Sequence, residues 1–530
     1  MNLNKTLYQT IKKVAKENPT NIAYDFLGFR RSYSDFLEDI DRSASFLYEL
    51  GIKEGDIISI YLPNIPQALE LFFAINKIGA ISNFIHPQMP IESNKQILEK
   101  MNPKAVFLLD SMHEKLRTLR DNSIADCYVI VRVSDYLPTW MKLFYKIREF
   151  YYASKIKLAA DAKYYVLNEQ SNNFSKSINP EDTATILFTG GTTGDPKGVC
   201  LSNFNINAAA YQTSSYRTQA QPGDKMLAIL PIFHGYGLAN CIYTALIEGG
   251  EVILLPYFSE KLFKKTIISK KPNYILGVPI LFSKLMELFS SEDINLSFFK
   301  GLYCGGSKLS EDLLDQFNDF LSVKGAQVLL REGYGLTECV GACSLMPEKS
   351  RKKNSVGHPY EGVRIKITDI ETHKELDAND IGRICIKSDT IMTGYYKEEA
   401  HNIRVECDER WLYTDDVGYL DKDGYLFYTD RLSRKVKILG YEVYPANIES
   451  IINKIDYVSD SCVVESNDQH ITSLKAYIVL VSNHKVSKKR KHIMDSLKKD
   501  LPKWSIPREI IFINKIPETL LKKKDYKRLK

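Results

Sequence analysis

Short apolar stretches alternate with amphipathic segments through the first two thirds of the chain. Residues Ile57–Leu62 have the continuous apolar character of a buried strand, and Ile65–Lys77 carries apolar residues at helical spacing. The strand pattern returns further along the chain, at Ala105–Leu109, Tyr128–Val131, Thr185–Phe188 and Val252–Leu255. This alternation predicts an α/β fold with a mostly parallel sheet, in which ligands bind beyond the carboxyl ends of the strands.

The pattern changes near residue 431, toward the end of the chain. Alternating apolar stretches are combined there with segments of helical periodicity. These strand and helix candidates are Ser461–Glu465, Leu474–Val481, Pro445–Lys454 and Ser487–Lys499. We therefore predict a large N-terminal domain over residues 1–431 and a small α+β domain over residues 432–530.

The segment Asp135–Lys163 departs from the alternation, because it is rich in aromatic and basic residues such as Trp140, Lys142, Lys146 and Arg148. An amphipathic helix of that composition can lie in the interface of a lipid bilayer, where basic side chains favour an anionic surface. The same composition also fits a helix packed on the surface of the large domain. Peripheral contact with a membrane is therefore one of two interpretations of this segment.

A stretch rich in glycine and hydroxyl groups follows the predicted strand at Thr185–Phe188. Glycines let backbone amides approach a ligand, and the hydroxyls and a lysine add donors and a positive charge, a combination that suits phosphate. The candidate phosphate-binding residues are Thr189, Gly190, Gly191, Thr192, Thr193, Gly194 and Lys197. The stretch is not the P-loop of nucleoside triphosphatases, because Lys197 precedes a glycine. A mobile surface loop without a ligand is the alternative.

Further candidate residues follow strand-like runs later in the chain. "LPIFHGYGL" supplies His234 as a candidate catalytic residue, although a lone histidine could be structural. The candidate nucleotide-binding residues of "YCGGSKL" and "REGYGLTE" are Gly305, Gly306, Gly333, Tyr334, Gly335 and Thr337. Glu338, at the end of the second motif, is a candidate Mg²⁺ ligand, because a carboxylate near bound phosphates can hold that ion. Asp416 and Arg431 offer an acceptor and a donor fork that could hold a ribose.

Composition narrows the class of protein. Hydrophobic residues make up 44% and charged residues 26% of the 530 residues, as in ordinary soluble globular proteins. A net charge of +6 is too weak to indicate a nucleic-acid partner, and none is predicted. The nine cysteines lack the spacing of zinc ligands, which favours free thiols in a reducing compartment. Without a secretory signal or a membrane-spanning run, we expect a cytoplasmic protein, with the inner membrane face as a second location.

In this order, the motifs resemble those of the adenylate-forming superfamily, which includes acyl-CoA synthetases, non-ribosomal-peptide adenylation domains and firefly luciferase. Thr189–Val199 matches the phosphate loop of that superfamily, and Tyr334–Glu338 resembles its adenine-stacking element. Gly382–Tyr395 is similar to the strand element that follows, while Asp416 and Arg431 match the ribose-binding pair. The resemblance covers nearly the whole chain.

The resemblance implies a two-step reaction that uses ATP, Mg²⁺ and coenzyme A. A carboxylate attacks the α-phosphate of ATP to give acyl-AMP and pyrophosphate, and a thiol then attacks the acyl carbonyl as AMP leaves. The tail "PETLLKKKDYKRL" is similar to the final motif of the family, so Lys523 matches the lysine that bridges carboxylate and α-phosphate. The family rotates its small domain between the steps, and Lys437 and Gly440 lie on the element that serves thioester formation.

Departures from the superfamily pattern occur at functional positions. The hinge after Arg431 is Ser433 rather than Asp or Lys, although a small polar residue can still act as a hinge. Asp415 stands beside Asp416 in place of the usual glycine, and Lys522 replaces the glycine before the catalytic lysine. A weakened member that binds nucleotide or acyl ligand without turnover is therefore kept as an alternative.

The residues around His234 guide the choice of acid. Amino-acid adenylation domains carry an aspartate in this region that binds the α-ammonium group, whereas His234 is followed here by glycine. Small residues at Gly235, Gly237, Gly305 and Gly306 predict pocket walls with room for a long chain. An amino acid is therefore not the expected substrate.

The glycine loop "FTGGTTG" and the aromatic-basic insert resemble those of long-chain fatty acyl-CoA ligases. We predict a ligase that joins a medium- or long-chain fatty acid to CoA. An aryl acid as substrate, or an acyl carrier protein in place of CoA as acceptor, is the alternative.

Overall fold

The structure is a computed structural model that describes residues 3–87, 91–139, 141–143, 145, 162–167, 178–189, 196–434, 436–438, 441–468, 471–481, 486–518 and 524–529. The chain forms two compact units. Unit 1 consists of Met1–Thr189, Lys197–Arg364 and Lys387–His401, and unit 2 consists of Gly190–Pro196, Ile365–Ile386 and Asn402–Lys530. Unit 2 therefore includes strands that precede residue 432. These strands pair with one another in one sheet. The predicted domain boundary between residues 431 and 432 stays a prediction.

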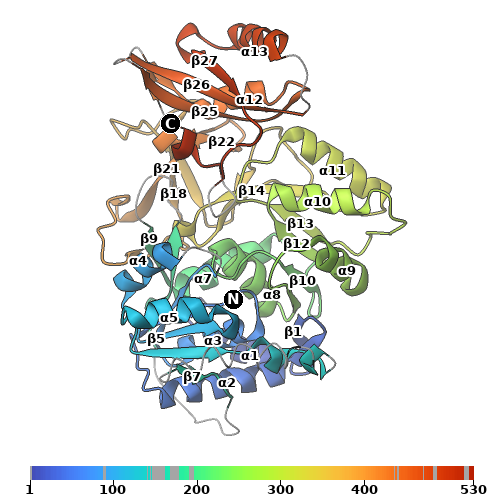
Figure 1. Cartoon of the computed structure of the whole chain (residues 1–530), viewed down its shortest axis with the longest axis vertical. Helices are drawn as coiled ribbons and strands as arrows, with labels where there is room; N and C mark the ends of the chain where they lie inside the picture. Colours follow the sequence, from blue (N-terminus) through green and yellow to red (C-terminus); the bar gives the residue numbers. More distant parts are fainter. Residues whose placement is uncertain are drawn as a thin grey trace. The chain divides into compact units, whose positions relative to one another are not determined.

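Unit 1 contains a nine-stranded sheet. The consecutive strands from β14 to β1 in this sheet run parallel to one another. In spatial order the strands are β16 (His358–Pro359), β15 (Ala342–Leu345), β14 (Leu330–Gly335), β13 (Gly301–Cys304), β12 (Tyr274–Gly277), β10 (Lys225–Ala228), β11 (Glu251–Leu254), β1 (Ile22–Phe26) and β2 (Phe29–Ser32). Helices α9 (Glu260–Lys270), α10 (Pro279–Phe289) and α11 (Glu311–Val323) cover one face, as Figure 1 shows. Their apolar residues build a core with the sheet.

A second sheet of unit 1 has eight strands. In spatial order they are β19 (Gly394–Tyr395), β9 (Lys197–Ser202), β8 (Thr183–Thr189), β4 (Ile81–Phe84), β3 (Ile57–Tyr61), β5 (Ala105–Leu109), β6 (Cys127–Val131) and β7 (Ala162–Tyr164). Helices α4 (Ile91–Met101) and α5 (His113–Asp121) pack on this sheet. The predicted strands at residues 57–62, 105–109, 128–131, 185–188 and 252–255 are all present, and the α/β fold is confirmed.

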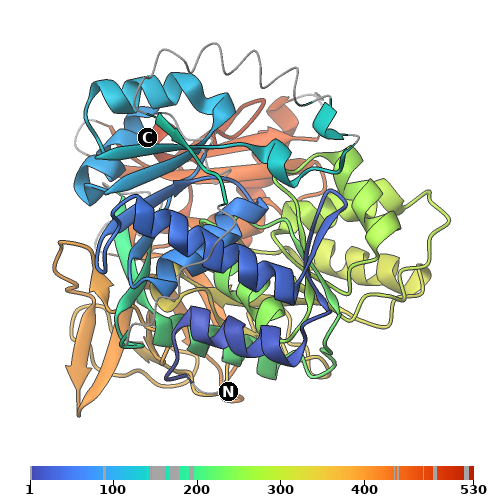
Figure 2. The same cartoon turned by 90° about the horizontal axis from the view of Figure 1, so that it is seen from below.

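The remaining helices of unit 1 pack against one another, and Figure 2 shows α1 and α2 side by side. They are α1 (Leu7–Glu17), α2 (Tyr33–Glu49), α3 (Pro66–Lys77), α7 (Asn203–Ser215) and α8 (Thr244–Ile247), with the short helices η1 (Asp110–Met112), η2 (Val133–Tyr136), η3 (Tyr236–Tyr243) and η4 (Thr337–Cys339). A proline at the first turn starts α3, and capping boxes start α1, α2 and α7. Asn76 ties three of these helices together: its side chain accepts from Tyr8 N and donates to Asn203.

Unit 2 contains three smaller sheets. The first consists of β17 (Arg364–Thr368), β18 (Gly382–Lys387), β21 (Glu409–Leu420), β20 (Ile403–Glu406) and β22 (Leu426–Arg431). The other two are the pair β23 (Val436–Ile438) and β24 (Tyr441–Val443), and the sheet of β25 (Val458–Asp468), β26 (Ile471–Leu480) and β27 (Glu509–Phe512). The helices are α12 (Pro445–Ile452), α13 (Val486–Asp500), η5 (Leu432–Arg434), η6 (Lys503–Ser505) and η7 (Tyr526–Leu529). Apolar residues of α12, α13 and these last sheets form one core.

Two predictions concern the surface and the thiols. None of the helices that the structure describes is long and apolar enough to cross a membrane. Most of the aromatic-basic segment at residues 135–163, including Lys146 and Arg148, lies outside the described residues, so its contact with a membrane stays a prediction. All nine cysteines carry free thiols.

Candidate active site

The glycine-rich stretch connects two paired strands of the eight-stranded sheet. Thr189 is the last residue of β8 and lies opposite Lys197, the first residue of the antiparallel strand β9. The pairing holds the two ends of the predicted phosphate loop next to each other. Gly190, Gly191, Thr192, Thr193 and Gly194 lie outside the described residues, and their phosphate-binding role stays a prediction.

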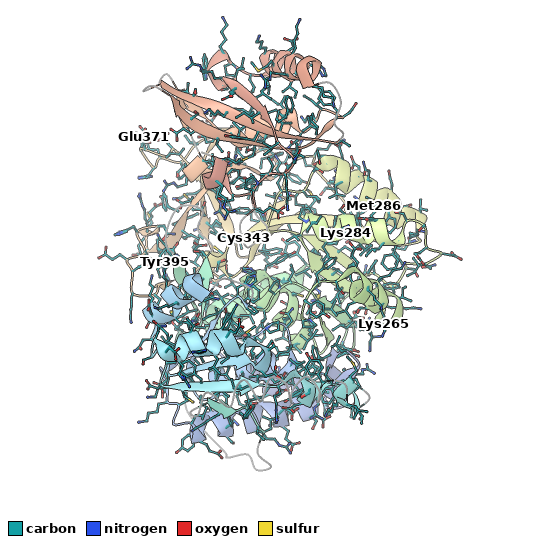
Figure 3. All side chains as sticks on the ribbon, in the orientation of Figure 1. Lys265, Lys284, Met286, Cys343, Glu371 and Tyr395 are labelled. Carbon is teal, nitrogen blue, oxygen red and sulfur yellow. The ribbon has the colours of Figure 1, made fainter. Side chains whose placement is uncertain are left out.

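Tyr395, which Figure 3 labels, links this loop to the predicted metal ligand. Strand β19 pairs with β9, with Tyr395 opposite Val199. The Nζ atom of Lys197 lies 4.9 Å from the centroid of the Tyr395 ring, a cation–π contact. The Tyr395 hydroxyl donates a 3.0 Å hydrogen bond to Oε1 of Glu338. One side chain therefore contacts both the cation that ends the loop and the candidate Mg²⁺ ligand.

The backbone around Glu338 is held in an unusual conformation. Val340 has a φ of +64°, which is rare for a β-branched residue and costs free energy. Hydrogen bonds maintain this turn: Val340 N donates to Thr337 O at 2.9 Å, and Leu336 N donates to Gly341 O at 2.9 Å. Met392 N also donates to Glu338 O at 2.8 Å, which fixes the main chain of the candidate ligand. Strain of this kind is concentrated at functional sites.

The glycines near His234 do not leave the room that the sequence suggested. A Cβ atom on Gly235 would lie 1.7 Å from the carbonyl oxygen of Val340, and one on Gly237 would lie 2.2 Å from that of Pro231. The prediction of open pocket walls is therefore wrong at these two positions. Glycine is needed there because another backbone segment occupies the space of a side chain.

At the other two glycines of that prediction, Gly305 and Gly306, an added Cβ atom would be at ordinary van der Waals distance from its neighbours. A Cβ atom on Gly305 would lie 3.5 Å from the ring of Tyr236, and one on Gly306 would lie 3.5 Å from Val278. Gly306 also has a φ of +77°, which favours glycine. The space beside Gly305 is thus bounded by an aromatic ring, and the nucleotide-binding role of both glycines stays a prediction.

His234 stands directly before an uncommon helix. Residues Tyr236–Tyr243 form a π-helix, and such turns are frequent at functional sites. The His234 ring is half-buried and lies 4.9 Å from that of Phe233, which in turn lies 4.4 Å from the ring of His86. Burial lowers the pKa of His86. Sequence reasoning missed His86, because Phe233, whose ring contacts it, is distant in the chain.

Strand β14 carries the predicted adenine-stacking element. Gly333 pairs with Leu345, Tyr334 with Ser344 and Gly335 with Ala342 on β15, while Thr337 begins η4. The Tyr334 side chain is buried. Their roles toward a nucleotide stay predictions.

Glu332, on the same strand, is a buried carboxyl group that sequence reasoning missed. Its Oε1 atom accepts a 3.0 Å hydrogen bond from Leu309 N, just after the glycine pair at residues 305–306. Burial raises the pKa of Glu332 to about 7, although the hydrogen bond from Leu309 acts in the opposite direction. The loop after β13 is therefore attached to a group that can titrate near neutral pH.

Unit 2 brings the predicted ribose-binding pair together. Asp416 on β21 and Arg431 on β22 are directly opposite in the antiparallel register, and Arg431 Nε lies 3.2 Å from Asp416 Oδ1. Asp416 is buried, whereas Asp415 is exposed. The alternation of the strand thus puts the extra carboxylate on the other face.

The structure describes less of the predicted catalytic elements of unit 2. Lys523 and Gly440 lie outside the described residues. Lys437 lies on β23 and Ser433 in η5, and their side chains are not among the described ones. The roles of these residues stay predictions.

Comparison with known proteins decides the family. A family profile described as AMP-binding enzyme matches residues 11–396, which is more than half of the chain. The chain belongs to the AMP-binding enzyme family. A second profile, for the AMP-binding enzyme C-terminal domain, matches residues 447–523. The predicted membership of the adenylate-forming superfamily is confirmed.

Curated relatives of this AMP-binding enzyme carry the names of CoA ligases. It is 30% identical to "Probable 4-coumarate--CoA ligase 1" of Dictyostelium discoideum over 498 residues, which cover 92% of this chain and 88% of the relative. It is 27% identical to "Long-chain-fatty-acid--CoA ligase" of Bacillus subtilis (strain 168) over 534 residues, which cover 98% and 93%. The prediction that the chain is an enzyme is confirmed at the level of an AMP-forming acyl- or aryl-CoA ligase.

Solved structures share the fold of this AMP-binding enzyme. ATP-bound MatB from Rhodopseudomonas palustris has a TM-score of 0.81 at 22% identity, and the match covers 100% of this chain and 98% of that one. o-Succinylbenzoate CoA synthetase from Bacillus subtilis, in complex with an acyl-adenylate, has a TM-score of 0.81 at 21% identity, covering 99% and 98%. At these identities the likeness shows the fold.

Glu332 should make the stability of this AMP-binding enzyme depend on pH. Because burial raises the pKa from 4.5 to about 7, the folded protein keeps a proton that the unfolded chain has already lost in this range. The contribution of Glu332 to the free energy of unfolding should therefore fall by up to about 3 kcal/mol as pH rises from about 4.5 to about 7, and then stay level. Glu332→Gln should lack this contribution, so its stability should fall less steeply than that of the wild type in denaturant titrations over this pH range.

The exposed Glu348 offers a matched control, because Glu348→Gln makes the same chemical change at the surface. Its stability curve should follow that of the wild type. An equal slope in wild type and Glu332→Gln would contradict the assignment.

Proposed function

We propose that this enzyme activates a medium- or long-chain fatty acid with ATP and transfers it to coenzyme A as a thioester. The observation that carries the adenylation step is the contact of Tyr395 with both Lys197 and Glu338. The Tyr395 side chain thereby connects the cation of Lys197, at the end of the glycine-rich loop, with the carboxylate of Glu338. That combination suits the phosphates of a nucleotide, with or without a divalent ion.

The first step joins the acid to the nucleotide. A carboxylate oxygen of the acid forms a bond to the α-phosphorus of ATP, and the bond to pyrophosphate breaks. Positioning and charge neutralisation account for most catalysis of this kind. Lys197 supplies positive charge near the phosphates, and Lys523 is proposed to contact the carboxylate and the α-phosphate. In the second step the sulfur of CoA bonds to the acyl carbon, and AMP leaves.

Glu338 fits the proposed role of Mg²⁺ ligand. Among the described residues, no cluster of three or more His, Cys, Asp or Glu side chains could hold a metal ion. Mg²⁺ commonly needs only one or two carboxylates, because substrate phosphates and water complete its coordination. The Glu338 side chain is only half-buried, which leaves it accessible. A bound Mg²⁺ ion would neutralise phosphate charge there.

The nature of the acid is supported by sequence. No carboxylate follows His234 to receive an amino group, and a long-chain fatty acid ligase aligns over 98% of this chain. These features favour an uncharged acyl chain.

An aryl acid is the second candidate. Relatives named 4-coumarate ligases reach 30% identity, and Tyr236 bounds the space beside Gly305 with an aromatic ring. The Tyr236 hydroxyl donates to Tyr303 O at 3.3 Å, which fixes the ring. Stacking on such a ring would favour a planar substrate.

A panel of acids tests the proposal. Pyrophosphate release should be measured with fatty acids of increasing length, with 4-coumarate and with amino acids, in the presence of CoA or of a phosphopantetheinylated carrier protein. Fatty acids with CoA should give the highest kcat/KM. Preference for 4-coumarate would overturn the fatty-acid assignment, and preference for the carrier protein would overturn the CoA assignment.

Glu338→Gln should depress adenylation by at least about tenfold, because the amide keeps the size of the side chain but loses its negative charge at the metal. Part of the loss should be recovered at higher Mg²⁺ concentration. The exposed Glu348 again provides the control substitution. Normal activity at ordinary Mg²⁺ would show that Glu338 does not hold the ion.

Lys523→Ala should separate the two steps. Adenylation should be lost, whereas conversion of supplied acyl-AMP and CoA to the thioester should survive, because the lysine is proposed to act only on ATP and the carboxylate. Lys515→Ala is the control: this lysine precedes the same tail and is 70% exposed. Equal loss of both steps in Lys523→Ala would rule out this role.

A further inference from the structure

Arg434 lies directly after the predicted hinge residue Ser433, and its side chain is only 13% exposed. Its guanidinium group pairs with two buried carboxylates. Nη1 donates to Asp430 Oδ1 at 3.2 Å, and Nη2 donates to Glu449 Oε1 at 2.6 Å. Nη2 also donates to Val463 O at 3.4 Å. Arg434 thus joins the end of β22 to α12 and β25.

The same guanidinium group also contacts the C-terminal tail. Its central carbon lies 4.0 Å from the ring centroid of Tyr526, a cation–π contact. Tyr526 and Leu529 pack beside a small apolar cluster of Cys462, Val464 and Ile516. The tail is therefore attached to the segment that follows the hinge through one side chain.

A second attachment lies next to the predicted catalytic lysine. Lys524 Nζ donates to Asp460 Oδ1 and to Ser461 O, both at 2.6 Å. Lys524 also forms an antiparallel bridge with Glu518. Glu518 and Lys524, which flank residues 519–523, are therefore held side by side, and Lys524 is attached to β25.

Loss of Arg434 would leave two buried carboxylates without the guanidinium group that pairs with them. The Oδ2 atom of Asp430 accepts from Ala446 N at 2.9 Å, and Oε1 of Glu449 accepts from Val463 N at 2.7 Å. Burial acts to lower the pKa of Arg434, but Glu449 and Asp430 outweigh it and raise that pKa. The guanidinium group is therefore charged, and the contacts around it form a single network.

We propose that Arg434 is a positioning residue for adenylation, which fixes the tail bearing Lys523 to the segment after the hinge. Residues 524–529, which directly follow the lysine in the sequence, are then held to that segment. The inference rests on the proposed function, because Lys523 has a task only if the enzyme forms acyl-AMP. It adds a residue that acts through Tyr526 and the tail rather than on the substrate.

The test compares substitutions at both ends of the contact. Arg434→Gln and Tyr526→Leu remove it, whereas Arg434→Lys keeps the charge and Tyr526→Phe keeps the ring. Arg434→Gln and Tyr526→Leu should lower the rate of acyl-AMP formation by about tenfold or more. Thioester formation from supplied acyl-AMP and CoA should stay within about threefold of wild type. Tyr526→Phe should restore adenylation.

Tyr526→Leu keeps the test valid if Arg434→Gln does not fold, because it removes the tail contact and leaves both ion pairs in place. Lys475→Gln is the control in unit 2: Lys475 lies on β26 and forms a 3.8 Å ion pair with the exposed Glu509. This control should leave both steps unchanged.

Hydrogen exchange gives a readout that does not depend on activity. Amides of residues 524–529 should exchange faster in Tyr526→Leu than in wild type, while those of α13 should not change. Unchanged exchange in the tail, or equal loss of both steps, would overturn the role of Arg434. Absence of acyl-AMP formation by wild type with every acid would instead overturn the proposed function, whatever the exchange data show.

Discussion

The pairing of β9 with both β8 and β19 is the constraint on which the candidate site of unit 1 depends. Pairing with β8 brings together the two ends of the glycine-rich loop. Pairing with β19 puts Tyr395 on the same strand ladder as Lys197, within reach of Glu338. Tyr395 can contact Lys197 only because the backbone hydrogen bonds fix the register of these strands. A shift of one residue would turn the Tyr395 ring to the other face of the sheet.

The fold could be predicted from the sequence where burial alone determines the pattern. β3 and β5 are apolar at nearly every position because helices cover the sheet, and α3 begins at Pro66 as a helix-starting proline predicts. The contribution of Tyr395 could not be predicted, because its partners are 198 and 57 positions away in the chain and the contact exists only in three dimensions. Gly235 was misread for a related reason: glycine indicates either open space or close backbone contact, and the sequence does not distinguish them.

The buried acids at Glu332 and around Arg434 are in different electrostatic environments. Glu332 has a backbone donor but no close cation among its described hydrogen-bond partners, and its pKa rises to about 7. Asp430 and Glu449 instead share the guanidinium group of Arg434. A buried carboxylate without a paired cation can lose its charge by taking up a proton, whereas a buried ion pair is destabilised strongly when one partner is removed. The first arrangement therefore responds to pH, and the second responds to substitution.

This difference bears on the departures at Ser433 and Lys522. At the predicted hinge, a small residue such as Ser433 would permit backbone rotation without offering an ion pair of its own. The neighbouring Arg434 provides the charged contacts, and these are directed inward to Asp430 and Glu449. In the tail, glycine would have given the loop its shape through backbone freedom. Lys524 and Tyr526, which follow Lys523 in the sequence, are anchored by their side chains. Near both departures, neighbouring side chains make contacts within unit 2: Arg434 beside Ser433, and Lys524 and Tyr526 after Lys522.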